Sequence, residues 1–144
     1  DPRNQNQSPQ MKLISKWGIV MIANFVQFII MFKAMDYKIN ISTCVLILLG
    51  LLFIAIGNYL PKCKPNYTVG IKLPWTLASE ENWRKTHRFA GPIWVIGGLL
   101  FTISAFSTYD WLAPGIIITL ATIPCIYSYL LFRREEREKH SAEK

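Results

Sequence analysis

Long uncharged apolar runs dominate the chain and determine the elements that it predicts. No charged residue occurs between Ile39 and Leu60, and Asp110 is the only one between Phe89 and Phe132. Apolar runs of about 18 residues or more are typical of membrane-spanning helices rather than of helices in a soluble core. The pattern therefore predicts an all-α, polytopic membrane protein.

The apolar pattern divides into four predicted spans, in a single membrane domain of residues 1–144. The spans cover residues 17–35, 42–60, 89–107 and 111–132. At a rise of 1.5 Å per residue, helices of about 20 residues match a hydrocarbon core of about 30 Å. Aromatic residues near the span ends, such as Trp17 and Trp111, are typical of the membrane interface. We expect a four-transmembrane-helix bundle with one long loop, residues 61–88, and a charged tail, residues 133–144.

Small residues recur every seven positions along two of the predicted spans. They are Gly50 and Gly57 in the second span, and Gly91, Gly98 and Ala105 in the third. This spacing places the small residues on one face of each helix, where the backbone of a neighbouring helix can approach closely. We expect these faces to allow close helix packing.

The net charge of +7 first suggests a nucleic-acid partner, but the positions of the charges favour a different explanation. Fourteen of the 16 Lys and Arg residues fall on the predicted side that holds both termini and the long loop. The opposite side holds only Lys33 and Lys38. Because cytoplasmic loops of membrane proteins are enriched in basic residues, we expect both termini and residues 61–88 to face the cytoplasm. We expect no direct contact with nucleic acid.

The long loop, residues 61–88, is the only segment large enough to form a surface outside the membrane. Prolines and a glycine predict that its first half is irregular. Ser79, followed by Glu80 and Glu81, predicts the start of a helix that continues into the third span. Arg84 and Arg88 would then form a basic stripe against anionic lipid headgroups.

Candidates for catalysis or metal binding are few. Cys63 lies between two lysines, which would favour its thiolate, although we interpret it as an incidental cysteine of a basic loop. A zinc site needs about four ligands, and only Cys63 and His87 occur near the loop. We expect His87 to bond a neighbouring loop or helix group. The sequence therefore predicts no catalytic residue, no metal and no cofactor.

Polar residues within the predicted spans bear on transport. No Asp, Glu, Lys, Arg or His lies in the hydrocarbon part of a span. Asn24 and Gln27 share a face of the first span and are the strongest intramembrane polar pair. We interpret them as groups that form hydrogen bonds between helices, which disfavours an ion-coupled transporter.

The loop sequence resembles the signature of the bacterial SdpI family, in which GN-x-hydrophobic-PK precedes NY-x-x-G-I-[KR]-x-PWTL and W-x-x-[TN]-[HN]-R. The matching residues are Gly57, Asn58, Pro61, Lys62, Asn66, Tyr67, Gly70, Ile71, Pro74, Trp75, Thr76, Leu77, Trp83, Thr86, His87 and Arg88. Leu73 departs from the pattern, because many members have Thr there. Many members also begin with two further membrane helices, so we expect this chain to be a fragment or a shorter form.

The resemblance implies a function at the bacterial cell membrane. The family is named after an immunity protein that protects its producer from a secreted, membrane-active peptide toxin and that holds a transcriptional repressor at the membrane. The expected partners are thus the lipid bilayer, a peptide toxin and an ArsR-like repressor. The expected partner- or ligand-binding residues are Asn58, Lys62, Asn66, Tyr67, Lys72, Trp75, Thr76, Trp83, Arg84, His87 and Arg88.

Two other functions remain open from the sequence. A small transporter or flippase component would need a continuous polar path through the spans. A membrane enzyme acting at the headgroup region would need four side chains of the loop to converge in one cavity. These side chains are Asn66, Trp75, His87 and Arg88. A flat cytoplasmic surface would instead favour docking of a partner protein.

Overall fold

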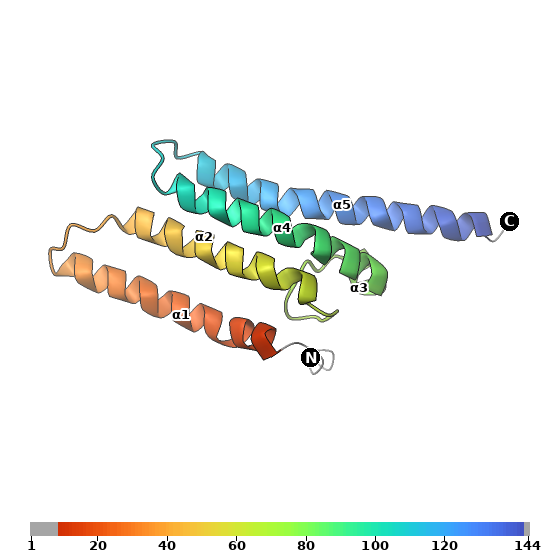
Figure 1. Cartoon of the computed structure of the whole chain (residues 1–144), viewed down its shortest axis with the longest axis horizontal. Coiled ribbons are helices and arrows are strands. Elements are labelled where there is room, and N and C mark those ends of the chain that lie inside the picture. The colour runs from red at the N-terminus through yellow and green to blue at the C-terminus, as the bar shows by residue number, and fades with distance from the viewer. Residues whose placement is uncertain (1–8, 143–144) are drawn as a thin grey trace.

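The computed structural model describes residues 9–142, and that range contains helices but no strand. Its four long helices are α1 (Pro9–Ala34), α2 (Ile41–Tyr59), α4 (Glu80–Ser104) and α5 (Leu112–Ala142). A 3-10 turn, η2 (Leu60–Lys62), and a short helix, α3 (Pro74–Ala78), lie between α2 and α4. Successive long helices run in opposite directions (Figure 1). The expected all-α fold is confirmed.

Helix α4 begins where the sequence predicts. The Ser79 hydroxyl accepts a hydrogen bond of 3.2 Å from the Asn82 N–H and acts as the N-cap. Glu81 lies in the first turn, where a carboxylate stabilises the positive end of the helix dipole. Its carboxylate also lies 2.7 Å from the Lys85 ammonium, one turn later. Local sequence alone is therefore enough to set this boundary.

Among residues 9–142, three helical segments are long and apolar enough to cross a membrane. They are Lys16–Ala34, Ile41–Lys62 and Leu112–Ser141. Helix α4 is not among them, because residues 80–88 are strongly polar and the apolar part that follows, residues 89–104, is short and contains Pro92. This apolar part also ends three residues before the end of the predicted third span, residues 89–107. The structure supports a membrane protein with three candidate spans, and a count of four remains a prediction.

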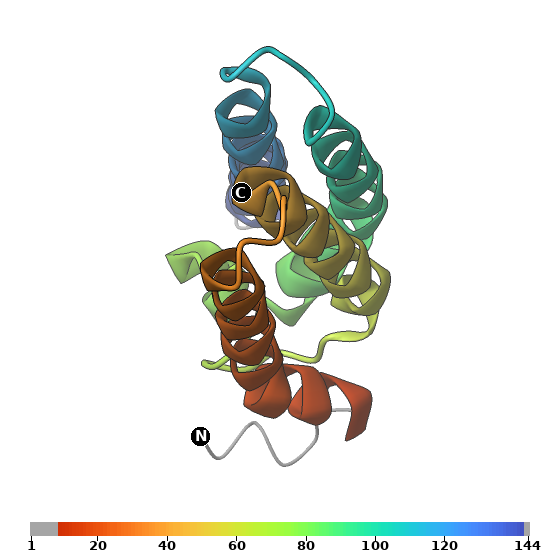
Figure 2. The same cartoon turned by 90° about the vertical axis from the view of Figure 1, so that its left-hand side faces the viewer.

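The four long helices of the expected bundle are arranged as an open row. Helix α2 packs on α4 and α4 packs on α5, whereas α1 packs only on α2. Figure 2 shows α2 lying between α1 and the α4–α5 pair. Within residues 9–142, no Cα atom of α5 lies within 8 Å of one in α2. An apolar run does not specify which of its faces meets a neighbour, so the row was not visible in the sequence.

Glycines allow the backbones of α2 and α4 to come into contact, and this contact places α4 next to α2 in the row. A Cβ atom added at Gly57 would lie 2.8 Å from the carbonyl oxygen of Gly91. One added at Gly50 would lie 2.7 Å from the carbonyl oxygen of Gly98. No residue larger than glycine fits this approach without a shift of the backbone. The seven-residue spacing of small residues is thus confirmed as a packing signal.

The polar segments collect at one end of the row. The start of α1, the loop with α3, and the end of α5 lie together there, and the two short connections lie at the other end (Figure 1). The exposed basic residues of the loop and of the tail therefore share one end of the molecule. This arrangement agrees with the separation of charges expected from the sequence.

Candidate functional site

The signature residues meet where the loop folds back onto the first turns of α4. Asn66 and His87 are fully buried, and Trp83 is 1% exposed. Cys63 is also buried, and Val69 and Leu77 pack around it and Trp83. We refer to Cys63, Asn66, Trp83 and His87 as the loop core.

Asn66 organises the backbone of the loop. Its side-chain oxygen accepts hydrogen bonds from the N–H groups of Thr68 (2.8 Å) and Val69 (2.7 Å). Its side-chain nitrogen donates to the carbonyl oxygens of Lys64 (2.8 Å) and Val69 (2.9 Å). A primary amide offers two acceptor positions and two donor positions, so all of them are used within the loop. No hydrogen-bonding group of Asn66 remains for a ligand.

His87 attaches the next part of the loop to α4. Its Nε2 accepts a hydrogen bond of 2.9 Å from the Ile71 N–H. The ring is therefore protonated at Nδ1, which donates to the Trp83 carbonyl oxygen at 2.8 Å. The imidazole also stacks on the Trp83 ring, with centroids 4.1 Å apart. The expectation that His87 bonds a neighbouring loop or helix group is confirmed.

Gly70 allows the loop to come this close to α4. Its φ angle is +124°, a backbone conformation that other residues rarely adopt. A Cβ atom at this position would lie 2.6 Å from Nε2 of His87 and 2.9 Å from two ring carbons of Trp83. Gly70 is therefore required both by its conformation and by the space available.

Trp83 and Cys63 close the loop core. The indole N–H of Trp83 donates to the Cys63 carbonyl oxygen at 2.8 Å. Burial raises the pKa of the Cys63 thiol, and a hydrogen bond from Asn66 only partly opposes this effect. The thiol donates to the Val69 carbonyl oxygen at 3.5 Å. The suggestion that flanking lysines favour a thiolate is therefore wrong, because the sulfur is buried and the charged form loses its hydration there.

A second polar cluster joins α3, α4 and α5. The Trp75 indole N–H donates to the Ser128 hydroxyl (2.9 Å), which donates to the Asn82 side-chain oxygen (2.8 Å). The Asn82 amide donates to the Ser128 carbonyl oxygen (3.1 Å), and the Thr86 hydroxyl donates to the Asn82 side-chain oxygen (3.1 Å). Neither Asn82 nor Ser128 was among the expected site residues. Only the four-residue spacing of Asn82 and Thr86 hinted at a shared polar face.

Trp75 and Thr76 hold the short helix α3 in place. The Trp75 ring packs against the rings of Tyr129 and Phe132 in α5, with centroid distances of 5.6 Å and 5.8 Å. The buried Thr76 hydroxyl accepts a hydrogen bond of 2.8 Å from the Leu73 N–H and so satisfies a donor at the helix start. Both expected site residues therefore contribute to the packing of the loop.

The remaining expected site residues lie on the surface of the same end. They are Asn58, Lys62, Tyr67, Lys72, Arg84 and Arg88, and all are exposed. The Lys62 ammonium lies 5.5 Å from the ring centre of Tyr59. The Lys72 ammonium donates to the carbonyl oxygens of Tyr67 (3.2 Å) and Thr68 (3.3 Å). We refer to Lys62, Lys72, Arg84 and Arg88 as the basic surface.

The side chains proposed for a membrane enzyme do not converge in one cavity. Asn66 and His87 both lie in the loop core, but their hydrogen-bonding groups are occupied. Trp75 bonds to α5 instead, and Arg88 is exposed. In the part of the chain that the structure describes, no three His, Cys, Asp or Glu side chains lie close enough to hold a metal ion.

The polar residues of the apolar helices form no continuous path. The Asn24 amide donates to the Val20 carbonyl oxygen of its own helix at 2.8 Å, and both Asn24 and Gln27 are exposed on α1. The expected bond from Asn24 to another helix is therefore wrong, because α1 contacts only α2 and this side chain bonds locally. The hydroxyls of Thr119 and Thr122 also donate to carbonyl oxygens of their own helix.

We expect the protein to lose stability as the pH falls below about 6.5. Burial lowers the pKa of His87 to about 4, although its bond to the Trp83 carbonyl oxygen favours the charged form. Above the ordinary pKa of about 6.5, His87 is neutral in both the folded and the unfolded protein. Between pH 6.5 and about 4 the unfolded protein takes up the proton first, so the free energy of unfolding falls by about 3 kcal/mol. Thermal unfolding of the detergent-solubilised chain across this range measures the loss. A profile that His87→Gln leaves unchanged would contradict the assignment.

Comparisons with known proteins agree with the resemblance seen in the loop. Residues 62–128 match the model of the SdpI/YfhL protein family. The chain is 22% identical over 128 residues to "Immunity protein SdpI" of Bacillus subtilis (strain 168), an alignment that covers 89% of this chain. It spans about three fifths of that relative's length, 61%. No solved structure gives a significant match.

Proposed function

We propose that this chain, a relative of the SdpI/YfhL protein family, is a membrane immunity protein that protects a bacterial cell from a membrane-active peptide toxin. The match over residues 62–128 carries this proposal, because that segment holds the loop core and the contact of α4 with α5. The similarity to a protein named as an immunity protein supplies the function. The three apolar helices support a location in the membrane.

The proposal includes four spans in the bacterial cell membrane, with both termini and residues 61–88 in the cytoplasm. Four long helices of alternating direction support an even number of crossings. Helix α4 lies between α2 and α5, so it exposes less surface to lipid and tolerates a lower hydropathy than its neighbours. The basic residues gathered at one end support the orientation.

Toxin recognition is proposed to occur among the helices, because the outer connections are too short to form a domain. Two apolar grooves lie along the row, one of 380 Å³ between α1 and α2 and one of 430 Å³ between α4 and α5. Either one suits an apolar peptide surface. To act as a signal, the toxin must bind one arrangement of the helices better than another.

A second proposed role is the capture of a cytoplasmic, ArsR-like repressor by the basic surface. The loop core attaches the loop to α4 through His87 and Trp83. A displacement of α4 would therefore move the loop together with the exposed side chains of Arg84 and Arg88. Such coupling needs two helix arrangements, of which the toxin stabilises one.

Expression of the chain in a toxin-sensitive bacterium tests the immunity proposal. We expect cells that make the chain to survive at least one peptide from a panel of membrane-active toxins that kills cells carrying an empty vector. Membrane insertion is checked in the same cells by fractionation, so that a chain that fails to insert is not scored. Equal killing of cells with the inserted chain and of control cells would overturn protection.

Recruitment of the repressor is scored separately, with a fluorescent repressor produced in the same cells. We expect toxin to move the fluorescence to the membrane, and the pair of substitutions Arg84→Gln and Arg88→Gln to abolish that movement. Because these side chains lie outside the loop core, the variant should still insert and fold. Unchanged recruitment in this variant would rule out the basic surface as the docking site.

A further inference from the structure

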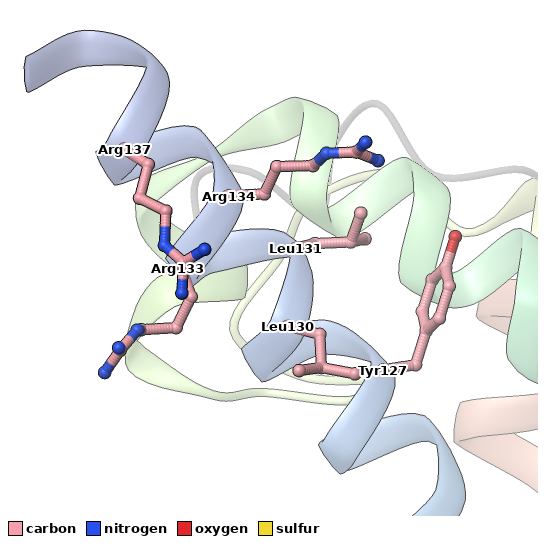
Figure 3. A pocket seen from close by; sticks show the side chains of 6 residues that line it. All are labelled: Tyr127, Leu130, Leu131, Arg133, Arg134 and Arg137. Atoms are coloured by element: carbon pink, nitrogen blue, oxygen red, sulfur yellow. The ribbon is translucent and has the colours of Figure 1, made fainter. Parts of the chain in front are cut away.

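A groove on α5 combines an apolar half with a basic half (Figure 3). Its volume is 360 Å³, within the range of about 300–1,000 Å³ typical of ligand-binding clefts. Its lining residues are Tyr127, Leu130, Leu131, Arg133, Arg134 and Arg137. The apolar residues come first along the helix, and the arginines follow directly where the apolar run ends. The groove thus changes character at the depth where a membrane span meets the headgroups.

Helical spacing places both halves of the groove on one face of α5. The lining residues form two adjacent rows with intervals of three and four residues, one at positions 127, 131 and 134 and one at positions 130, 133 and 137. Each row leads from the apolar half to the basic half (Figure 3). The Tyr127 ring is held by stacking on Phe89 of α4, with centroids 4.0 Å apart. The apolar floor is therefore fixed before any ligand binds.

The arginines of the groove form few ion pairs with carboxylates of the chain. Arg134 Nε lies 3.9 Å from Glu138, and both side chains are mostly exposed, so water screens this pair strongly. Arg133 donates to a neutral partner, the Tyr129 hydroxyl, at 3.4 Å. Among residues 9–142, no carboxylate pairs with Arg137 within 4.0 Å. The basic half therefore presents guanidinium groups that are available to an external anion.

We propose that this groove binds one anionic phospholipid, with its phosphate on the arginines and its acyl chains along Tyr127 and Leu130. Guanidinium groups match the oxygens of a phosphate geometrically and bind them through paired N–H donors. The apolar half favours a phospholipid over free phosphate, because inorganic phosphate has no apolar group that could pack against it. The proposal rests on the membrane location proposed above but does not depend on toxin protection.

Lipid titration of the full chain in a neutral detergent tests the proposal. Phosphatidylglycerol, phosphatidylcholine and inorganic phosphate are added separately, and native mass spectrometry counts the bound molecules. We expect phosphatidylglycerol to bind preferentially. Because a basic residue near an anionic headgroup contributes about 1 kcal/mol, Arg133→Gln and Arg137→Gln should each weaken that binding about fivefold.

Lys139→Gln is the matched control, since it removes the same charge from the same helix outside the groove. We expect it to change phosphatidylglycerol binding little. Equal weakening by the control would show general electrostatic attraction to the basic tail. Equal binding of the two lipids would show that the groove does not select an anionic headgroup. Either result would overturn the site. Binding of inorganic phosphate as strong as that of phosphatidylglycerol would overturn the choice of a lipid. Toxin survival is measured separately, so a failed lipid site remains distinguishable from a failed immunity function.

Discussion

Replacing Trp83 with alanine is expected to destabilise the fold by about 3–5 kcal/mol, the usual cost of truncating a fully buried Trp or Phe side chain. The indole is 1% exposed and forms the centre of the loop core. Its removal also deprives the His87 ring of its stacking partner and the Cys63 carbonyl oxygen of its donor. The loop should then separate from α4 before the apolar helices separate from one another.

Two readouts check this expectation. Thermal unfolding in detergent gives the loss of stability, and maleimide labelling mapped by mass spectrometry reports the release of the buried thiol of Cys63. Trp83→Phe keeps an aromatic ring but loses the N–H, so we expect a smaller loss of about 1–2 kcal/mol. Trp111→Ala is the matched control, because that side chain is 68% exposed. If Trp83→Ala has no larger effect than this control, the loop core does not hold the loop to α4.

Local and periodic features of the fold could be predicted from the sequence. The Ser79 cap depends on atoms within one turn of helix, and the apolar runs need only length and composition. The pairing of Gly57 with Gly91 was signalled by a seven-residue repeat in each helix. Each of these signals is contained in a short stretch of chain, and so it survives without knowledge of the tertiary structure.

The partners of the signature residues could not be predicted, because these partners are distant in the sequence. The bond from Ile71 to His87 spans 16 residues, and that from Trp75 to Ser128 spans 53. Polar and aromatic residues gathered in a loop favour an interpretation as a binding site. In the structure, many of these polar side chains form hydrogen bonds with buried backbone N–H and C=O groups. A loop without regular secondary structure needs such bonds, because its backbone groups do not pair with one another.

Because many of the signature residues are buried, only the exposed ones are available to bind a partner. The loop core fixes the loop on α4, and the Trp75 cluster fixes α3 on α5. The loop therefore responds to the positions of two helices at once, and those positions depend in turn on the contact of α2 with α4. A substitution in that contact should consequently reach the loop even though it lies far from the loop core.

Replacing Gly57 with leucine provides this test and is expected to cost about 1–3 kcal/mol or more, as overpacking of a tight contact does. A Cβ atom there would lie 2.8 Å from the Gly91 carbonyl oxygen and 2.7 Å from the Val95 backbone nitrogen. Since both neighbours are backbone atoms, they cannot move aside as a flexible side chain could. Leucine is also more apolar than glycine, so any loss arises from packing and not from weaker membrane insertion.

Gly18→Leu in α1 is the control, because a Cβ atom there would meet no atom within 4 Å beyond its own turns of helix backbone. We expect this control to unfold at nearly the parent temperature, and Gly57→Leu to unfold at a clearly lower one. If α2 and α4 transmit their positions to the loop, Gly57→Leu should also increase the labelling of Cys63, which is buried in the parent protein. Equal unfolding temperatures for the two variants would mean that α2 and α4 are not in backbone contact, and the open row built on that contact would be wrong.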